Sequence, residues 1–188
     1  MDSKAEKHLE FNSFHTTFFD FFFYYFTYFG DGVTALIISL ILIAVNYRNA
    51  LFVGLSNIIS ALITQLLKHT LFADVVRPKK FFEGIHELYL VPREDNYLYY
   101  SFPSGHSTCA FALYFALALI VENKILKLLF FIIASLVGYS RIYLSQHFFE
   151  DVYAGSLIGV VTTLIMFYFL KKTNNNWMNQ SFIKSFKG

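Results

Sequence analysis

The chain has 188 residues, of which 56% are hydrophobic, 20% are aromatic and only 15% are charged. Because a soluble domain of this length carries charge on about a quarter of its residues, the composition is typical of a membrane protein. The net charge of +2 is too small to indicate a nucleic-acid partner. The single cysteine, Cys109, excludes an internal disulfide.

The predicted elements begin with an aromatic-rich segment at residues 14–29, whose phenylalanines and polar residues fall on opposite sides of a helix. This pattern favours a helix in the membrane interface, with a sixth spanning helix as the alternative. Five further apolar stretches predict transmembrane helices. They cover approximately residues 32–47, 51–71, 105–121, 125–144 and 152–170. The expected fold class is therefore all-α, a polytopic membrane helical bundle, with one domain over residues 1–188 and its motif-bearing core at about 51–170.

Two of these stretches carry a further pattern. Polar residues in 51–71 recur on one helical face, which we expect to point into the bundle because polar groups are unfavourable in lipid. The members of this polar stripe are Asn57, Ser60, Thr64, Gln65 and Lys68. In 152–170, Gly155 and Gly159 form a GxxxG spacing that permits close contact with another helix.

The distribution of basic residues predicts the orientation in the membrane. With five alternating spans, Arg48, Lys124 and the tail after the last span lie on one side, and their positive charge indicates the cytoplasmic side. The loop at about 72–102 and the turn around His147 then face outward.

Three clusters of polar residues lie at helix ends on that outward side. They are Lys68 with Arg77-Pro78, then Pro103-Ser104-Gly105-His106, then Ser140-Arg141 with His147 and Asp151. Phosphoryl transfer needs cations around the phosphoryl oxygens, an in-line nucleophile and an acid for the leaving oxygen. Lys68, Arg77 and Arg141 supply the cations. Ser104 and Gly105 stand before an apolar helix, whose N-terminus can bind an anion.

Two histidines complete the predicted chemistry. His147 and Asp151 are spaced i, i+4, so Asp151 can orient one ring nitrogen and leave the other free to attack phosphorus. His106 is the natural acid for the leaving oxygen. A metal site built from His106, His147 and Asp151 is the main alternative, but the surrounding cations favour an anion. We therefore expect no metal and no cofactor. Four histidines belong to no such cluster: His8, His15, His69 and His86.

These clusters resemble the three motifs of the type 2 phosphatidic acid phosphatase (PAP2) superfamily, which includes bacterial membrane lipid phosphatases and vanadium haloperoxidases. The second motif (residues 103–106) and the third (Ser140-Arg141-x5-His147-x3-Asp151) match in full. In the first, eight residues rather than the family's usual six separate Lys68 from Arg77. The resemblance implies a metal-independent helical bundle with a phosphohistidine on His147. It also implies that Asp151 orients this histidine and that His106 protonates the leaving group.

The resemblance further implies a lipid phosphate substrate, taken from the surrounding membrane lipids of a bacterial inner membrane. Because the site is expected to face outward, undecaprenyl diphosphate is the favoured substrate, and activity as a lipid A 1-phosphatase or a phosphatidylglycerophosphate phosphatase is the alternative. A transporter or channel would explain the polar stripe but not three motifs at one surface. A haloperoxidase shares the oxyanion site, but its known members are soluble.

Overall fold

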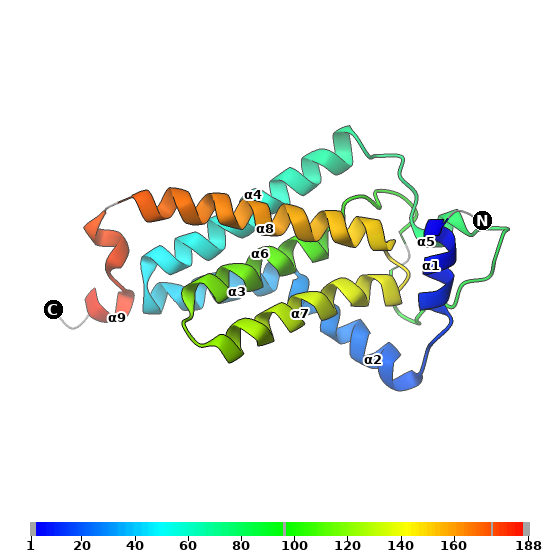
Figure 1. Cartoon of the computed structure of the whole chain (residues 1–188), viewed down its shortest axis with the longest axis horizontal. Helices are drawn as coiled ribbons and strands as arrows, with labels where there is room; N and C mark the ends of the chain where they lie inside the picture. The colour runs from blue at the N-terminus through cyan, green and yellow to red at the C-terminus, as the bar shows by residue number, and fades with distance from the viewer. Residues whose placement is uncertain (1–2, 96, 174, 186–188) are drawn as a thin grey trace.

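The computed structural model describes residues 3–95, 97–173 and 175–185, and within these ranges every regular element is a helix. The expectation of an all-α fold is therefore confirmed. In chain order the helices are α1 (Ser3–Asn12), α2 (Thr17–Phe26), η1 (Thr27–Gly30), α3 (Gly32–Val45), α4 (Tyr47–Thr70), α5 (Pro78–Phe81), α6 (Gly105–Ile120), α7 (Lys124–Tyr143), α8 (Phe149–Lys172), η2 (Asn176–Asn179) and α9 (Phe182–Ser185). Figure 1 shows the long helices side by side.

Side-chain caps explain where the long helices begin. Asp31 accepts a hydrogen bond from the backbone of Val33 at the start of α3, and Asn123 accepts from Ile125 at the start of α7. Asn46 caps α4 in the same way, by accepting from the backbone of Asn49. This cap starts α4 at Tyr47, four residues before the apolar stretch predicted from residue 51.

Three helices in the described part of the chain are long and apolar enough to cross a membrane, namely α4, α7 and α8. The α2–η1 segment and α3 pass the same criterion together, as one unit bent by 52°. The aromatic segment at 14–29 thus forms the first arm of a bent helix pair. Helix α6 is apolar but has only 16 residues. Length and composition therefore support three or four spans and do not confirm the expected five or six.

Helix α6 packs closely against α8 because two glycines remove the side chains between them. A Cβ atom added to Gly155 would lie 2.5 Å from the carbonyl oxygen of Ser104, and one added to Gly159 would lie 2.5 Å from that of Thr108. Any larger residue would force the helices apart, so the GxxxG spacing has the packing role expected for it.

Most of the predicted polar stripe on α4 points into the bundle. Thr64 donates a hydrogen bond to Thr108 on α6, and Asn57 accepts one from the thiol of Cys109. Ser60 and Lys68 are buried as well. Gln65 is exposed, and its assignment to the stripe was wrong. It directly follows Thr64 in the helix, so its side chain points away from the inward face.

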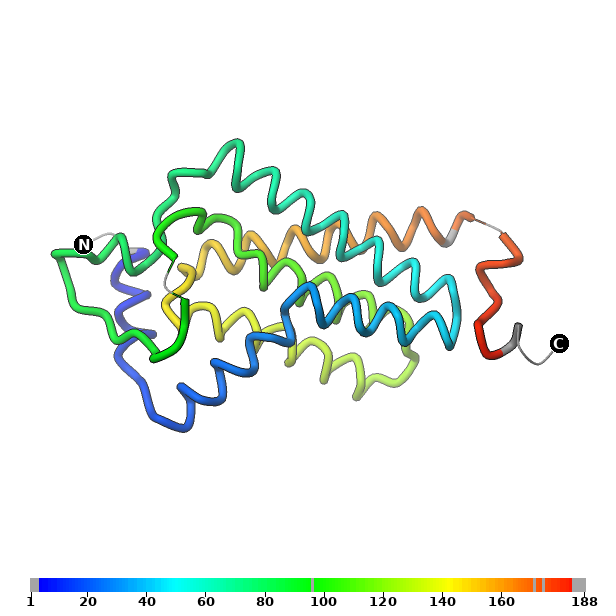
Figure 2. Tube along the Cα trace, turned by 180° about the vertical axis from the view of Figure 1, so that it is seen from behind, coloured from blue at the N-terminus to red at the C-terminus, as the bar shows by residue number. Residues whose placement is uncertain are grey.

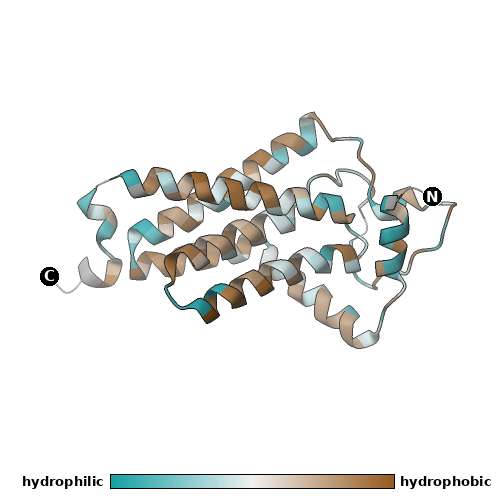
Figure 3. Ribbon diagram, in the orientation of Figure 1, coloured by the Kyte–Doolittle hydropathy of each residue, from teal (hydrophilic) through white to brown (hydrophobic). Residues whose placement is uncertain are grey.

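The bundle has two distinct ends. The N-terminal helix α1 and the short helix α5 lie at one end, and α9 lies at the other (Figures 1 and 2). Colouring by hydropathy shows apolar residues along the middle of the bundle, with hydrophilic residues gathered on α1 and near the C-terminal end of α8 (Figure 3). This distribution matches a bundle whose central part lies in lipid.

Candidate active site

The three sequence clusters come together at the end of the bundle that carries α1. Lys68 and Arg141 lie in the last turns of α4 and α7, which run toward this end. Ser104 caps α6 and Asp151 lies in the first turn of α8, which both run away from it. A hydrogen bond of 2.9 Å from the backbone N–H of Ser104 to the Asp151 carbonyl joins the starts of α6 and α8.

The carboxylate of Asp151 is held by two donors and lies beside His147. Its Oδ2 accepts hydrogen bonds from the hydroxyl of Ser101 at 2.5 Å and from the backbone N–H of Phe148 at 3.0 Å. The same oxygen lies 3.5 Å from Nδ1 of His147, within ion-pair distance but too far for a well-formed hydrogen bond. Helix α8 begins at Phe149, so His147 precedes the helix and reaches Asp151 across its first turn.

The surroundings of His147 favour its neutral form. The side chain is only 2% exposed. Burial and the positive charges of Arg77, Lys68 and Arg141 hold the pKa of His147 well below its usual value. A neutral imidazole keeps a lone pair on one ring nitrogen, which is the state that a nucleophile requires.

Arg141 is buried and only partly satisfied. One terminal nitrogen donates to the hydroxyl of Thr27 at 2.8 Å and lies 3.4 Å from a carboxylate oxygen of Glu94. Its Nε is buried and has no hydrogen-bond partner among the described residues. Burial raises the pKa of Glu94 above its usual value, although the charge of the nearby Arg141 opposes this shift. A guanidinium with an unused donor is suited to bind an oxyanion.

Arg77 and Lys68 are both anchored through carbonyl groups of the loop before α6. Arg77 donates from Nε to the Tyr99 carbonyl and from a terminal nitrogen to the side chain of Gln146, at 3.0 and 2.9 Å. Burial lowers the pKa of Arg77 to about 10, so it remains charged at neutral pH. Lys68 donates to the Tyr100 carbonyl at 3.0 Å. The two extra residues before Arg77 therefore leave Lys68 beside the other clusters.

The start of α6 supplies the second cluster. Ser104 is fully buried, and its hydroxyl oxygen accepts from the backbone and hydroxyl of Ser107. The space beside the α-carbon of Gly105 is open. An anion can therefore approach the N-terminus of this helix closely. His106 lies in the first turn of α6, directly after Ser104 and Gly105, at the same end of the bundle as the other site residues.

Four residues contact the site although the sequence analysis did not select them. Ser101 binds Asp151, and Gln146 binds Arg77. Thr27 and Glu94 both bind Arg141. Ser101 stands two residues before Pro103 and could have been considered as part of an extended second motif. The other three have no spacing pattern that distinguishes them. Among the described residues, no three His, Cys, Asp or Glu side chains form a group that could hold a metal ion.

Comparison with known proteins identifies a family whose sequence model matches most of this chain. The sequence model of the PAP2 superfamily matches residues 49–175. Phosphatidylglycerophosphatase B of Bacillus subtilis is 36% identical in an alignment of 81 residues, and the coverage is 38% of this chain and 38% of that protein. Lipid A 4'-phosphatase of Porphyromonas gingivalis is 29% identical over 82 residues, which are 44% of this chain and 35% of that protein. The chain thus matches little more than a third of the length of these curated relatives.

Two solved structures share most of the fold. The crystal structure of LpxE from Aquifex aeolicus superposes with a TM-score of 0.77 at 26% identity, over 87% of this chain and 93% of that one. A PAP2-type phosphatidylglycerolphosphate phosphatase from Bacillus subtilis gives a TM-score of 0.70 at 22% identity, over 93% of this chain and 87% of that one. The second likeness concerns the fold alone. Because the matched residues 49–175 make up more than half of the chain and contain all three clusters, the protein belongs to the PAP2 superfamily.

Proposed function

We propose that the protein is a membrane lipid phosphate phosphatase that works through a phosphohistidine on His147. The single observation that carries this proposal is the placement of His147, a buried histidine held neutral beside Asp151 and three cations. A neutral imidazole next to a carboxylate is a nucleophile, and cations around it bind the phosphoryl oxygens that the nucleophile must approach.

The proposed reaction has two steps. Nε2 of His147 forms a bond to phosphorus while the bond from phosphorus to the lipid oxygen breaks, and Asp151 stabilises the imidazolium that results. His106 gives a proton to the departing lipid oxygen. Water then attacks the phosphohistidine with His106 as the base, which releases inorganic phosphate and restores the neutral ring. Lys68, Arg77, Arg141, Ser104 and Gly105 bind the phosphoryl oxygens throughout.

The substrate class follows from the relatives and from the expected orientation. The relatives are named for phosphatidylglycerophosphate and for lipid A, and both are phosphorylated envelope lipids. We therefore favour one of these two lipid phosphates. Undecaprenyl diphosphate, which the outward orientation favours, is the alternative substrate of the same site.

A panel of lipid phosphates tests the function directly. Purified protein in detergent should release phosphate from at least one of the three lipids, and His147→Ala should remove that activity while leaving the helical content unchanged. If the wild-type protein binds but never hydrolyses any of them, the transporter or channel alternative becomes the better account.

The same assay tests metal independence. Because the site is cationic and binds oxyanions, EDTA should leave activity intact and vanadate should compete with substrate, since its trigonal-bipyramidal form resembles the transition state. Loss of activity in EDTA that is restored by Zn²⁺ or Mg²⁺ would instead favour the metal-site alternative.

We also propose that α6 crosses the membrane together with the longer helices, and that the active site faces outward from a bacterial inner membrane. The support is that α6 lies along α8 through Gly155 and Gly159. Cysteines introduced at Glu87 and Asn175 in a Cys109→Ser background test the orientation. An impermeant thiol reagent added to intact cells should label the cysteine at position 87 and not that at 175, and the reverse pattern would place the site in the cytoplasm.

A further inference from the structure

The turn between α7 and His147 has a specific geometry that links the phosphate-binding arginine to the nucleophile. Ser145 donates from its backbone to the carbonyl of Ile142, and Gln146 donates to that of Arg141. These two bonds form a Schellman motif, in which the residue after the helix adopts a left-handed conformation. His147 also donates its backbone N–H to the Arg141 carbonyl, at 3.1 Å. The position of His147 therefore depends directly on this turn.

Ser145 occupies the position of the turn where glycine is usual. Its φ is +52°, a conformation in which any residue with a Cβ atom is strained. Its side chain is 1% exposed. Glycine would adopt this conformation with less strain, so the turn alone does not explain a serine here.

The hydroxyl of Ser145 is bound by two residues of α1. Asn12 donates from Nδ2 to the Ser145 oxygen at 3.0 Å, and Nε2 of His8 lies 3.3 Å from the same oxygen. The amide of Asn12 also exchanges two hydrogen bonds of 2.9 Å with the backbone of Tyr89. Asn12 thus joins α1, the loop before α6 and the turn before His147.

His8 also contacts the residue on the other side of the nucleophile. Its ring stacks on Phe82 and meets Phe148 edge-on, with centroids 5.9 and 5.2 Å apart. Phe148 in turn donates its backbone N–H to Asp151. His8 therefore contacts Ser145, two residues before His147, and Phe148, the residue directly after it.

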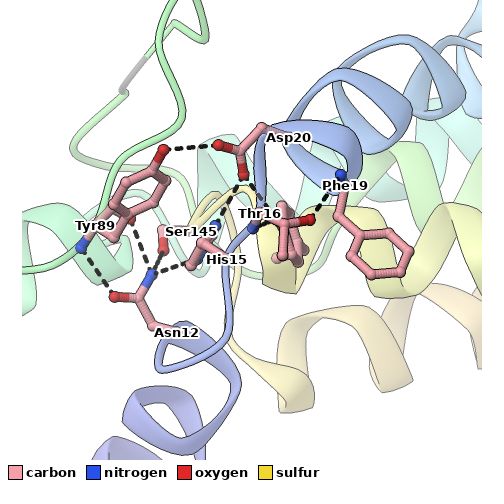
Figure 4. A network of polar contacts seen from close by, with 8 residues as sticks. Asn12, His15, Thr16, Phe19, Asp20, Tyr89 and Ser145 are labelled. Atoms are coloured by element: carbon pink, nitrogen blue, oxygen red, sulfur yellow. Dashed lines mark hydrogen bonds and ion pairs between the residues drawn. The ribbon is translucent and has the colours of Figure 1, made fainter.

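A second polar network fixes α1 in this place. Asp20 on α2 accepts hydrogen bonds of 2.6 Å from the hydroxyls of Tyr143 and Tyr89. Figure 4 shows the bond from Tyr89 and the contact of Asp20 with Nδ1 of His15, which lies at 3.1 Å. Tyr143 belongs to the last turn of α7, directly before the turn that holds Ser145. The segment between α1 and α2 is thereby tied to the same helix end that it contacts through Asn12.

We propose that α1 is a positioning element of the active site, in which Asn12 and His8 bind Ser145 and thereby set the orientation of His147. This inference rests on the proposed role of His147 as nucleophile. The three residues do not touch the substrate and act through the turn. A small displacement of a reacting group is costly, and about 1 Å is enough to lower a rate by roughly 100-fold.

A positioning role can be separated from a structural one because the best-folding substitutions are expected to be poor catalysts. Ser145→Gly removes the hydroxyl and relieves the strained φ, so its thermal midpoint should equal or exceed that of the wild type. His8→Phe keeps the packing against Phe82 and Phe148 and removes a ring nitrogen, Nδ1, that is buried without a partner among the described residues. Both variants should nevertheless lose turnover.

The experiment compares four variants with the wild type on the lipid phosphate that it hydrolyses best. Ser145→Gly, His8→Phe and Asn12→Ala should lower kcat roughly 10- to 100-fold with little change in KM. His8→Gln should recover part of the loss, because its amide can reach Ser145. The control is Ser39→Ala on α3, which should keep wild-type kcat. Among the described residues, the Ser39 hydroxyl bonds only to the Ala35 carbonyl of its own helix.

A readout independent of turnover distinguishes this inference from the proposed function. Acylation of His147 by diethyl pyrocarbonate, followed by peptide mass, should be slow in the wild type and several-fold faster in Ser145→Gly and His8→Phe. If the wild type hydrolyses no lipid phosphate, the proposed function fails, and the acylation rates still decide whether α1 positions His147. Wild-type kcat and acylation rate in Ser145→Gly would overturn the inference. A fall in kcat that merely follows a fall in thermal midpoint would also overturn it.

Discussion

Each end of the helical bundle has an arginine that bonds to another segment of the chain, but the two arginines have different partners. At the end away from α1, Arg48 donates to the carbonyls of Leu170 and Thr173 and to the side chain of Asn179. These partners belong to the end of α8 and to the tail, so Arg48 caps α8 and anchors the tail. At the α1 end, Arg141 has a buried Nε without a partner among the described residues.

This difference separates a structural cation from one that is available to a ligand. Arg48 directs its donors at groups of its own chain, and no histidine is bonded to it among the described residues. Together with burial, the positive charges of Arg77, Lys68 and Arg141 lower the pKa of His147. We therefore expect the chemistry to be confined to the α1 end.

The largest effect that separates the ends should come from the proposed acid. His106→Ala should lower activity on a lipid alkyl phosphate by roughly 10²- to 10⁴-fold, because the alkoxide needs a proton as it leaves. The loss on p-nitrophenyl phosphate should be much smaller, since nitrophenolate leaves without protonation. Equal losses on the two substrates, measured as kcat/KM, would mean that His106 only binds phosphate.

The two arginines should respond to the same substitution in different ways. Arg141→Ala should lower kcat by roughly 10²- to 10³-fold, as expected when a donor to the transition state is removed. Arg48→Ala should keep kcat near the wild-type value and lower the thermal midpoint, because carbonyls at the end of α8 lose their partner. A large loss of turnover in Arg48→Ala would contradict the comparison.

A smaller effect concerns the acid stability of the α1 end. Burial is the main cause that lowers the pKa of His8 to about 4, with the charge of Asp151 opposing this shift and that of Lys4 adding to it. Between pH 6.5 and 4 the unfolded chain binds a proton at His8 that the folded chain does not, so stability falls as the pH falls. The loss reaches at most about 3 kcal/mol. Thermal midpoints measured from pH 7 to pH 4 should fall less for His8→Phe than for the wild type, and equal slopes would argue against a neutral buried ring.

Several parts of this arrangement could be predicted from the sequence. The apolar stretches predicted the long helices, and the motif spacings selected seven of the polar side chains that meet at one end. Those spacings are informative because consecutive helices alternate in direction. The C-terminal end of one helix and the N-terminal end of the next therefore lie on the same side of the bundle. Gln65 was the error, since one residue of helix turns a side chain by about 100° and moves it off the stripe.

The long-range contacts made by α1 and η1 could not be predicted. His8 and Ser145 are separated by 137 residues, and Thr27 and Arg141 by 114. Nothing in local periodicity links residues so far apart. The residues of α1 are mixed in charge and carry none of the three motifs. The left-handed conformation of Ser145 has no sequence signal when the residue is not glycine.

The most direct test of the central claim is to look for phosphate on His147. Protein mixed with a hydrolysable lipid phosphate and quenched in alkali, where phosphohistidine persists, should carry the added phosphate on the peptide that contains His147. The His147→Ala protein should carry none, and His106→Ala should accumulate more than the wild type when a p-nitrophenyl substrate is used, because its second step lacks a base. Phosphate found on another residue, or turnover without any phosphorylated protein, would contradict the account.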